Sequence, residues 1–225
     1  MKKNLFLLCV FIFSIVSCNK KSEPINLELE GFPEASCLIG PGLGTLGVIK
    51  GSFVYTHYLT SDREWKLDRL STFVIPAGAE GVLALGMGYL GVLNDNTIKI
   101  YYLDNDSEWK KFEGADFEIP SRYKRLFGVK FSYEMGMIAL ENNGNIFFYY
   151  LDEDLSWKLD ETATFGVPDN TRQVCSLGNN IMGMVVENDV LFAYLNAEEN
   201  KWEVDYEFSV HIPSGFEAVE GPEIL

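Results

Sequence analysis

The sequence is poor in histidine and cysteine. It has two histidines, His57 and His211, and four cysteines among 225 residues. Both histidines stand in stretches expected to form strands, so they do not suggest a nucleophilic triad. Carboxylates are so numerous that no acid–base pair stands out from the others. Catalysis is therefore neither shown nor excluded. A protein without catalytic residues is favoured, and no cofactor is expected.

Basic side chains are also scarce. The sequence has 18 lysines and arginines against 33 aspartates and glutamates, for a net charge of −15. A body of this charge repels phosphate backbones, which excludes nucleic acid as an expected partner. A strongly anionic membrane surface is disfavoured for the same reason.

The one long apolar run, residues 5–16, is too short to span a bilayer and follows Lys2 and Lys3. These features predict an export signal at residues 1–17. The run ends in Ile-Val-Ser-Cys at Cys18, which resembles the lipobox of bacterial lipoproteins. This resemblance implies lipidation of Cys18 after cleavage before it, with residues 18–32 as a lipidated tether. An ordinary secretory signal is the alternative.

The residue after Cys18 is Asn19. In the lipoprotein family this pattern implies sorting to the outer membrane, with the protein held there by its lipid anchor. The sequence leaves open whether the protein faces the periplasm or the cell surface.

Two cysteines remain in the body, Cys37 and Cys175, each three positions before a glycine. In an oxidising compartment the two can form a disulfide. The alternative is a pair of small buried thiols.

Four tryptophans mark a repeat of about 45 residues. Each follows a Tyr-Leu pair by seven or eight residues, and each repeat ends in an Ile-Pro or Val-Pro. The pairs are Tyr58/Trp65, Tyr102/Trp109, Tyr150/Trp157 and Tyr194/Trp202. Since these aromatic residues recur in every unit, we expect them to build the core.

No part of the body shows helical periodicity, and short runs rich in Val, Ile, Phe and Tyr alternate with Asn, Asp and Gly turns. In the third repeat we predict strands at 125–131, 136–141, 146–151 and 157–167. Four antiparallel strands per unit are typical of a β-propeller blade. We therefore predict an all-β fold, a small propeller of four blades with four antiparallel strands each. An open or five-bladed arrangement is the alternative.

The pattern Tyr-x-Asp-x-x-x-x-Trp, with a proline before the next unit, resembles the kelch repeat. The resemblance covers residues 33–213 and implies a kelch-like propeller domain at 33–225. One feature departs from the family pattern, because no repeat ends its second strand with a Gly-Gly pair.

Two other motifs have simpler interpretations. Residues 42–47 and 86–91 match Gly-x-Gly-x-x-Gly, but a strand follows where a dinucleotide site needs a helix, so we predict hairpins and no nucleotide. Carboxylates crowd the turns before each tryptophan, for example Asp104, Asp106 and Glu108. Their spacing lacks the ligand count of a calcium loop, so we expect a solvated acidic rim and no metal.

Basic residues gather in the loops that join consecutive units, which we expect at one end of the propeller. Arginine beside tyrosine suits carboxylate or sugar-hydroxyl recognition. The predicted ligand-binding residues are Arg122, Tyr123, Lys124, Arg125 and Arg172. We predict a cell-envelope protein that binds a glycan or a partner protein without catalysis. The alternatives are a carbohydrate-processing enzyme and a structural subunit of an envelope complex.

Overall fold

The computed structural model describes residues 37–42, 45–62, 64–86, 88–120, 122–129, 135–178, 180–196 and 198–212, all within one compact unit, Glu34–Leu225. Side chains are described from residue 47 onward. The predicted signal (1–17), the tether (18–32) and the lipidation site Cys18 lie outside these residues. Within them no helix has the length and apolar character needed to cross a membrane.

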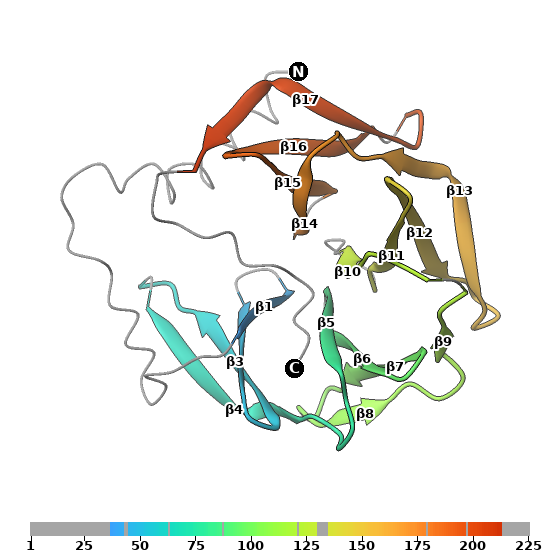
Figure 1. The fold of residues 1–225 in the computed structure, drawn as a ribbon. Coiled ribbons are helices and arrows are strands. Elements are labelled where there is room, and N and C mark those ends of the chain that lie inside the picture. The colour runs from blue at the N-terminus through green and yellow to red at the C-terminus, as the bar shows by residue number, and fades with distance from the viewer. Residues whose placement is uncertain are drawn as a thin grey trace. The chain divides into compact units, whose positions relative to one another are not determined.

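Four antiparallel sheets follow one another along the chain, and each has its strands in sequence order. The sheets surround a central axis as the blades of a four-bladed β-propeller, which confirms the predicted fold class (Figure 1). The strands are, in blade 1, β1 (Cys37–Gly42), β2 (Thr45–Lys50), β3 (Phe53–Leu59) and β4 (Trp65–Val74); in blade 2, β5 (Gly81–Gly86), β6 (Tyr89–Asn94), β7 (Thr97–Leu103), β8 (Trp109–Lys111) and β9 (Phe117–Glu118); in blade 3, β10 (Arg125–Val129), β11 (Met137–Asn142), β12 (Asn145–Leu151) and β13 (Trp157–Gly166); and in blade 4, β14 (Thr171–Gly178), β15 (Ile181–Val186), β16 (Asp189–Asn196) and β17 (Lys201–His211).

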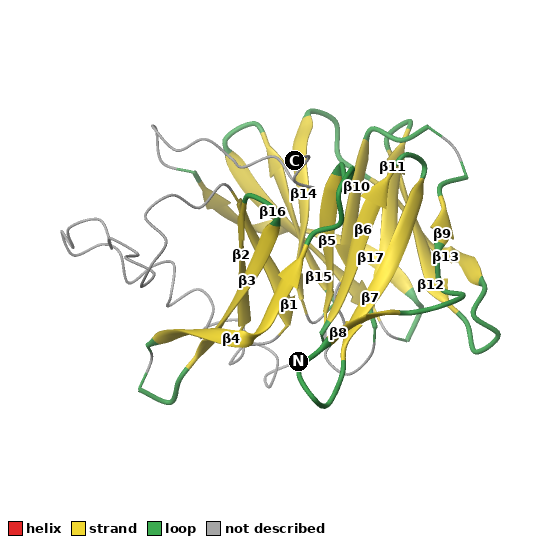
Figure 2. Ribbon diagram, turned by 90° about the horizontal axis from the view of Figure 1, so that it is seen from below, coloured by secondary structure: helices red, strands yellow, loops and turns green. Residues whose placement is uncertain are grey.

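Blade 3 shows how well the pattern located the strands. The four predicted ranges agree with β10 to β13 to within two residues at every end. The Gly-rich stretch at 86–91 forms the turn between β5 and β6, which is a hairpin as predicted. Because the strands of a blade are antiparallel, successive turns alternate between the two ends of the propeller (Figure 2). The β11–β12 turn and the loops between blades therefore lie at the same end.

The core consists of apolar clusters between consecutive blades. Successive residues of a strand face opposite sides of the sheet, and therefore Val82 and Ala84 of β5 pack toward blade 1 while Leu83 and Leu85 pack toward blade 3. Three such clusters join blades 1 and 2, blades 2 and 3, and blades 3 and 4. A blade with both faces apolar is stable only between neighbours, which is why the repeat does not fold as a single unit.

Two tryptophans link neighbouring blades by hydrogen bonds. The indole N–H of Trp109 in blade 2 donates to the carbonyl oxygen of Ser71 in blade 1, at 2.8 Å. Trp157 in blade 3 donates in the same way to Ala115 in blade 2, also at 2.8 Å. Trp202 is buried in the third cluster. For these three residues the predicted core role is confirmed.

The same prediction is wrong for four aromatic residues of the repeat. The exposed ones are Tyr58, Trp65, Tyr150 and Tyr194. Each of these tyrosines lies opposite a charged residue of the next strand, and the phenol of Tyr194 donates a hydrogen bond to that residue, Glu203, at 2.7 Å. The residue before the repeat tyrosine faces the opposite side, and in blade 3 this residue, Tyr149, packs on Phe117 with ring centroids 5.0 Å apart.

An aspartate three positions after the tryptophan shapes the outermost strand in three blades. The carboxylates of Asp68, Asp160 and Asp205 accept hydrogen bonds from backbone N–H groups two or three residues further on, at 3.0 to 3.1 Å. They hold a bulge in the strand. Blade 2 has Phe112 at this position, and there a turn with Gly114 at φ 85° divides the strand into β8 and β9.

Asp160 should make the stability of the protein depend on pH. Burial opposes its ionisation, but hydrogen bonds from Thr162, Asn200 and the backbone outweigh burial and lower the pKa below the usual 3.8. A lowered pKa means that the ionised group stabilises the fold above the unfolded-state value, and this contribution is lost as the pH falls through the folded-state pKa.

We therefore expect Asp160→Asn to be less stable than the parent at neutral pH, with the difference shrinking as the pH falls below about 4. Urea unfolding at a series of pH values measures this. Glu161→Gln, at the exposed neighbouring position, is the control and should follow the parent. A constant difference between Asp160→Asn and the parent across this range would contradict the prediction.

Candidate functional site

A pocket of about 480 Å³ lies at the end of the propeller that carries the loops between blades. Three segments line it: residues 122–124 before β10, residues 141–144 at the β11–β12 turn, and residues 167–171 before β14. These segments place the pocket on blade 3, at its boundary with blade 4. Its volume falls within the range of about 300–1,000 Å³ that is typical of small-molecule sites.

Backbone hydrogen bonds fix the loops around the pocket. The N–H of Lys124 donates to the carbonyl of Glu141 at 2.7 Å, and the N–H of Val167 donates to that of Gly144 at 2.9 Å. The Oγ1 of Thr171 donates to the carbonyl of Pro168 at 2.6 Å. Asn143 and Asn170 occupy the left-handed region, with φ of 51° and 63°, which asparagine tolerates.

Several polar side chains of the pocket have no partner among the residues that the structure describes. Within the described residues, the side chains of Arg122, Asn142, Asp169 and Asn170 make no hydrogen bond or ion pair. Asn142 and Asn170 each offer an amide donor and an amide acceptor to the pocket. Tyr123 is half-buried, and burial, followed by the nearby charge of Glu80, raises its pKa, so its phenol keeps its proton.

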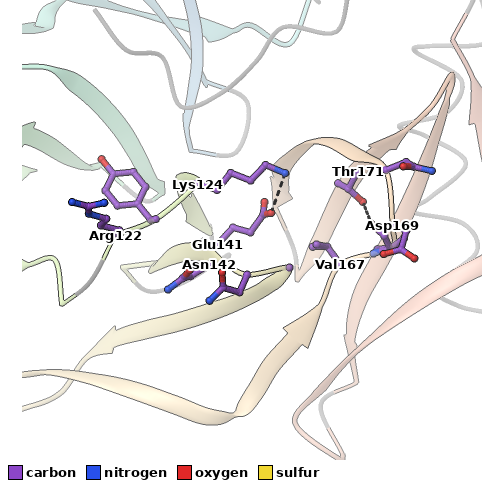
Figure 3. A pocket seen from close by; sticks show the side chains of 12 residues that line it. Arg122, Lys124, Glu141, Asn142, Val167, Asp169 and Thr171 are labelled. Carbon is purple, nitrogen blue, oxygen red and sulfur yellow. Dashed lines mark hydrogen bonds and ion pairs between the residues drawn. The ribbon is translucent and has the colours of Figure 1, made fainter.

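A buried glutamate lies among these groups. The side chain of Glu141 is only 2% exposed, and its carboxylate forms an ion pair with Arg125, whose side chain is 10% exposed. The second oxygen of Glu141 lies 3.6 Å from the ammonium of Lys124, which is 63% exposed. Figure 3 shows Lys124 reaching to Glu141, with Arg122 at one side of the pocket and Asp169 and Thr171 at the other.

The ion pair is peculiar to blade 3. Arg125 and Glu141 face each other across the first two strands of blade 3. At the same position the other blades have an apolar residue opposite a small or uncharged one. The equivalent pairs are Cys37 with Ile49, Gly81 with Leu93, and Gln173 with Val185. Fold alone therefore does not demand a charge at this position, and removing a charge pair from water is costly.

Arg125 also joins blade 3 to blade 4. Its Nη2 donates to the carbonyl oxygens of Thr171 and Arg172, both at 2.6 Å. Since Thr171 lines the pocket, Arg125 fixes the position of the far wall relative to Glu141. Three of the five N–H donors of its guanidinium are thus taken by protein groups.

The five residues predicted to bind a ligand separate into two groups. Arg122, Tyr123 and Lys124 line the pocket. Arg125 and Arg172 do not, and Arg172 directs its guanidinium to the carbonyl of Glu187 in a turn of blade 4. Whether any of the five contacts a ligand stays a prediction.

Sequence reasoning missed the pocket residues outside the basic loop, including Glu141, Asn142, Asp169 and Asn170. A signal for one of them was present, because Glu141 interrupts a strand whose counterparts are apolar at that position. The other three stand in ordinary turn sequences, which carry no such signal.

The acidic turns bind their own backbone. Asp104 accepts hydrogen bonds from the N–H groups of Asp106 and Glu108, each at 2.9 Å, and forms an ion pair with Lys110. That contact holds the pKa of Asp104 below its usual range. Among the described residues, no three His, Cys, Asp or Glu side chains are grouped as metal ligands.

The pairing of the two cysteines stays a prediction. Cys37 lies on β1, and its side chain is outside the described part. Cys175 lies on β14, with its Sγ 3.8 Å from the carbonyl oxygen of Gly183.

The fold and pocket define a small β-propeller with a polar site at one end. No protein-family model matches the sequence, and no curated protein matches it. Many solved structures match the chain, including the following two. A protein from Lactobacillus plantarum has 12% sequence identity and a TM-score of 0.43, over 75% of this chain and 53% of that one. A functionally unknown protein from Desulfotomaculum acetoxidans DSM 771 has 15% identity and a TM-score of 0.42, over 74% and 52%. This chain spans about half the length of each.

Proposed function

We propose that the protein is a non-catalytic binding module whose pocket on blade 3 holds a glycan fragment. The observation that carries this is a set of polar side chains there, two amides, a carboxylate and a guanidinium, that have no partner within the described part of the chain. A sugar presents many hydroxyl groups, each a donor and an acceptor, and amides satisfy both. The half-buried Tyr123 adds an apolar ring surface beside them.

The sequence supports a cell-envelope setting for this module. The lipobox-like sequence ending at Cys18 predicts an outer-membrane lipoprotein, held through its lipid and facing either side of the membrane. The repeat pattern further suggests a kelch-like propeller. A glycan of the envelope or the surroundings is the ligand expected for a protein anchored there, and an envelope protein is the other partner to test.

Binding of the purified protein to a glycan array tests the proposal. We expect one or more sugars to bind, and Asn142→Ala and Asn170→Ala each to weaken binding by about 5- to 10-fold, because each removes one or two hydrogen bonds of about 0.5–1.5 kcal/mol. Both residues are at turns, so a thermal unfolding curve for each variant should check that the fold is kept.

Lys201→Ala is the control, because Lys201 is exposed and begins β17 at the opposite end of the propeller. It should leave binding unchanged. If no sugar binds, or if the two asparagine variants bind as well as the parent, the pocket is not a glycan site. Capture of an envelope protein that these same variants lose would then assign the pocket to a protein partner.

A further inference from the structure

The pocket differs in charge from the rest of the surface. At the opposite end of the propeller the lysines are neutralised locally: Lys110 pairs with Asp104, Lys158 with Asp152, and Lys201 with Glu199. At the pocket, Arg122 makes no ion pair with any described residue. Arg69, Lys99 and Arg172 also make no ion pair with a described residue, but of these four cations only Arg122 lines the pocket.

Lys124 is only partly neutralised. Glu141 carries one negative charge and shares it between two cations, Arg125 and Lys124. Arg125 holds the buried contact and two backbone carbonyls, whereas Lys124 sits 3.6 Å from the carboxylate with most of its side chain in solvent. Because the ammonium of Lys124 is largely in solvent and Arg125 already holds the carboxylate, turning the ammonium toward a ligand costs little.

The positive groups and the amides occupy the same pocket. Asp169 lies across it from Arg122, and so it limits where a negative charge can sit: near Arg122 and Lys124 and away from Asp169 (Figure 3). A planar guanidinium binds a carboxylate through two parallel hydrogen bonds, which gives the position a defined orientation.

We propose, on the basis of the glycan-binding function above, that the pocket selects an acidic sugar, a hexuronic acid whose carboxylate is bound by Arg122 and Lys124. The sugar hydroxyl groups bind Asn142, Asn170 and Asp169. Glu141, already held by Arg125, keeps Lys124 at the pocket until the ligand arrives. Arg122 is the residue that sets specificity for the carboxylate.

Matched sugars test this directly. Galacturonic and galactose oligosaccharides of equal length differ at carbon 6 of each residue, which is a carboxylate in one and a hydroxymethyl group in the other. Calorimetric titration of the purified full chain should give an affinity about 10- to 100-fold higher for the acidic sugar, from one charge-assisted contact. The preference should fall as salt is raised, because the contact is exposed to solvent.

Arg122→Gln should remove most of this preference, because it should weaken binding of the acidic sugar far more than binding of the neutral one. Arg122→Lys keeps the charge but loses the planar fork, and should retain part of the preference. Lys124→Gln should lower the preference for the acidic sugar without removing it. Arg122 is exposed at the rim, so these changes leave the fold intact, and equal thermal unfolding curves verify this.

Each outcome has a distinct meaning. If the neutral sugar binds as tightly as the acidic one, or if Arg122→Gln keeps the preference, the acidic-sugar inference is wrong while the glycan-binding function stands. If a sulfated or phosphorylated sugar binds and the carboxylated one does not, the ligand class is wrong. If no sugar of any kind binds, the proposed function itself fails.

Discussion

Replacement of Arg125 by methionine should destabilise the protein by about 3 kcal/mol, the cost expected when one partner of a buried ion pair is removed. The change leaves the carboxylate of Glu141 buried, with the exposed Lys124 as its remaining cation. It also removes the donor to the carbonyls of Thr171 and Arg172, and with it a bond between blades 3 and 4. Urea unfolding followed by tryptophan fluorescence measures the loss.

The protein contains its own control for this experiment. Blade 4 has Gln173 opposite Val185 in the register that Arg125 and Glu141 occupy in blade 3. The double variant Arg125→Gln/Glu141→Val installs that pair, removes both charges together, and should cost no more than about 1 kcal/mol. A double variant as unstable as Arg125→Met would show that the interblade bonds, and not the stranded charge, determine the loss.

The second large effect is expected at Gly128 on β10. A Cβ atom there would lie 2.1 Å from the backbone carbonyl oxygen of Ala84 on β5, far inside van der Waals contact. Gly128→Ala must therefore push the inner strands of blades 2 and 3 apart. Overpacking usually costs about 1–3 kcal/mol, and we expect the upper end of this range or more, because a backbone atom cannot turn aside as a side chain can.

Gly166→Ala on β13 is the matched control. Its added Cβ would have the side-chain oxygen of Asn145 as nearest neighbour, at 3.7 Å, an ordinary contact. Here alanine should be neutral or slightly stabilising, since it restricts the unfolded chain. Thermal unfolding of both variants compares them. Equal midpoints would mean that the two inner strands move apart without strain.

The repeat allowed the fold to be predicted because its signals are local. A turn sequence, a tryptophan and a proline recur at a constant period, and they place four strands in each unit without any knowledge of neighbours. The split strand of blade 2 was not predicted, although Phe112 stands where the other blades have an aspartate. In the other blades this aspartate holds the bulge by accepting hydrogen bonds from the backbone. That role becomes clear only when the outermost strands of the four blades are compared in the structure.

The site could be predicted only in part, for a physical reason. The basic loop at 121–125 is contiguous in sequence, so Arg122, Tyr123 and Lys124 were identified together. The destination of a long side chain depends on its surroundings in the folded protein. Arg125 and Lys124 are neighbours in sequence, yet one is fixed between blades and the other reaches into the pocket.

The interrupted outer strands have a consequence for a protein crowded beside copies of itself. The outermost strand of a sheet presents unpaired backbone groups that can recruit a strand from another molecule. Here that strand carries an aspartate-held bulge in three blades, and in blade 2 the Gly114 turn divides it into β8 and β9. A bulged or divided strand is a poor template for a foreign strand, so we expect these features to disfavour edge-to-edge aggregation.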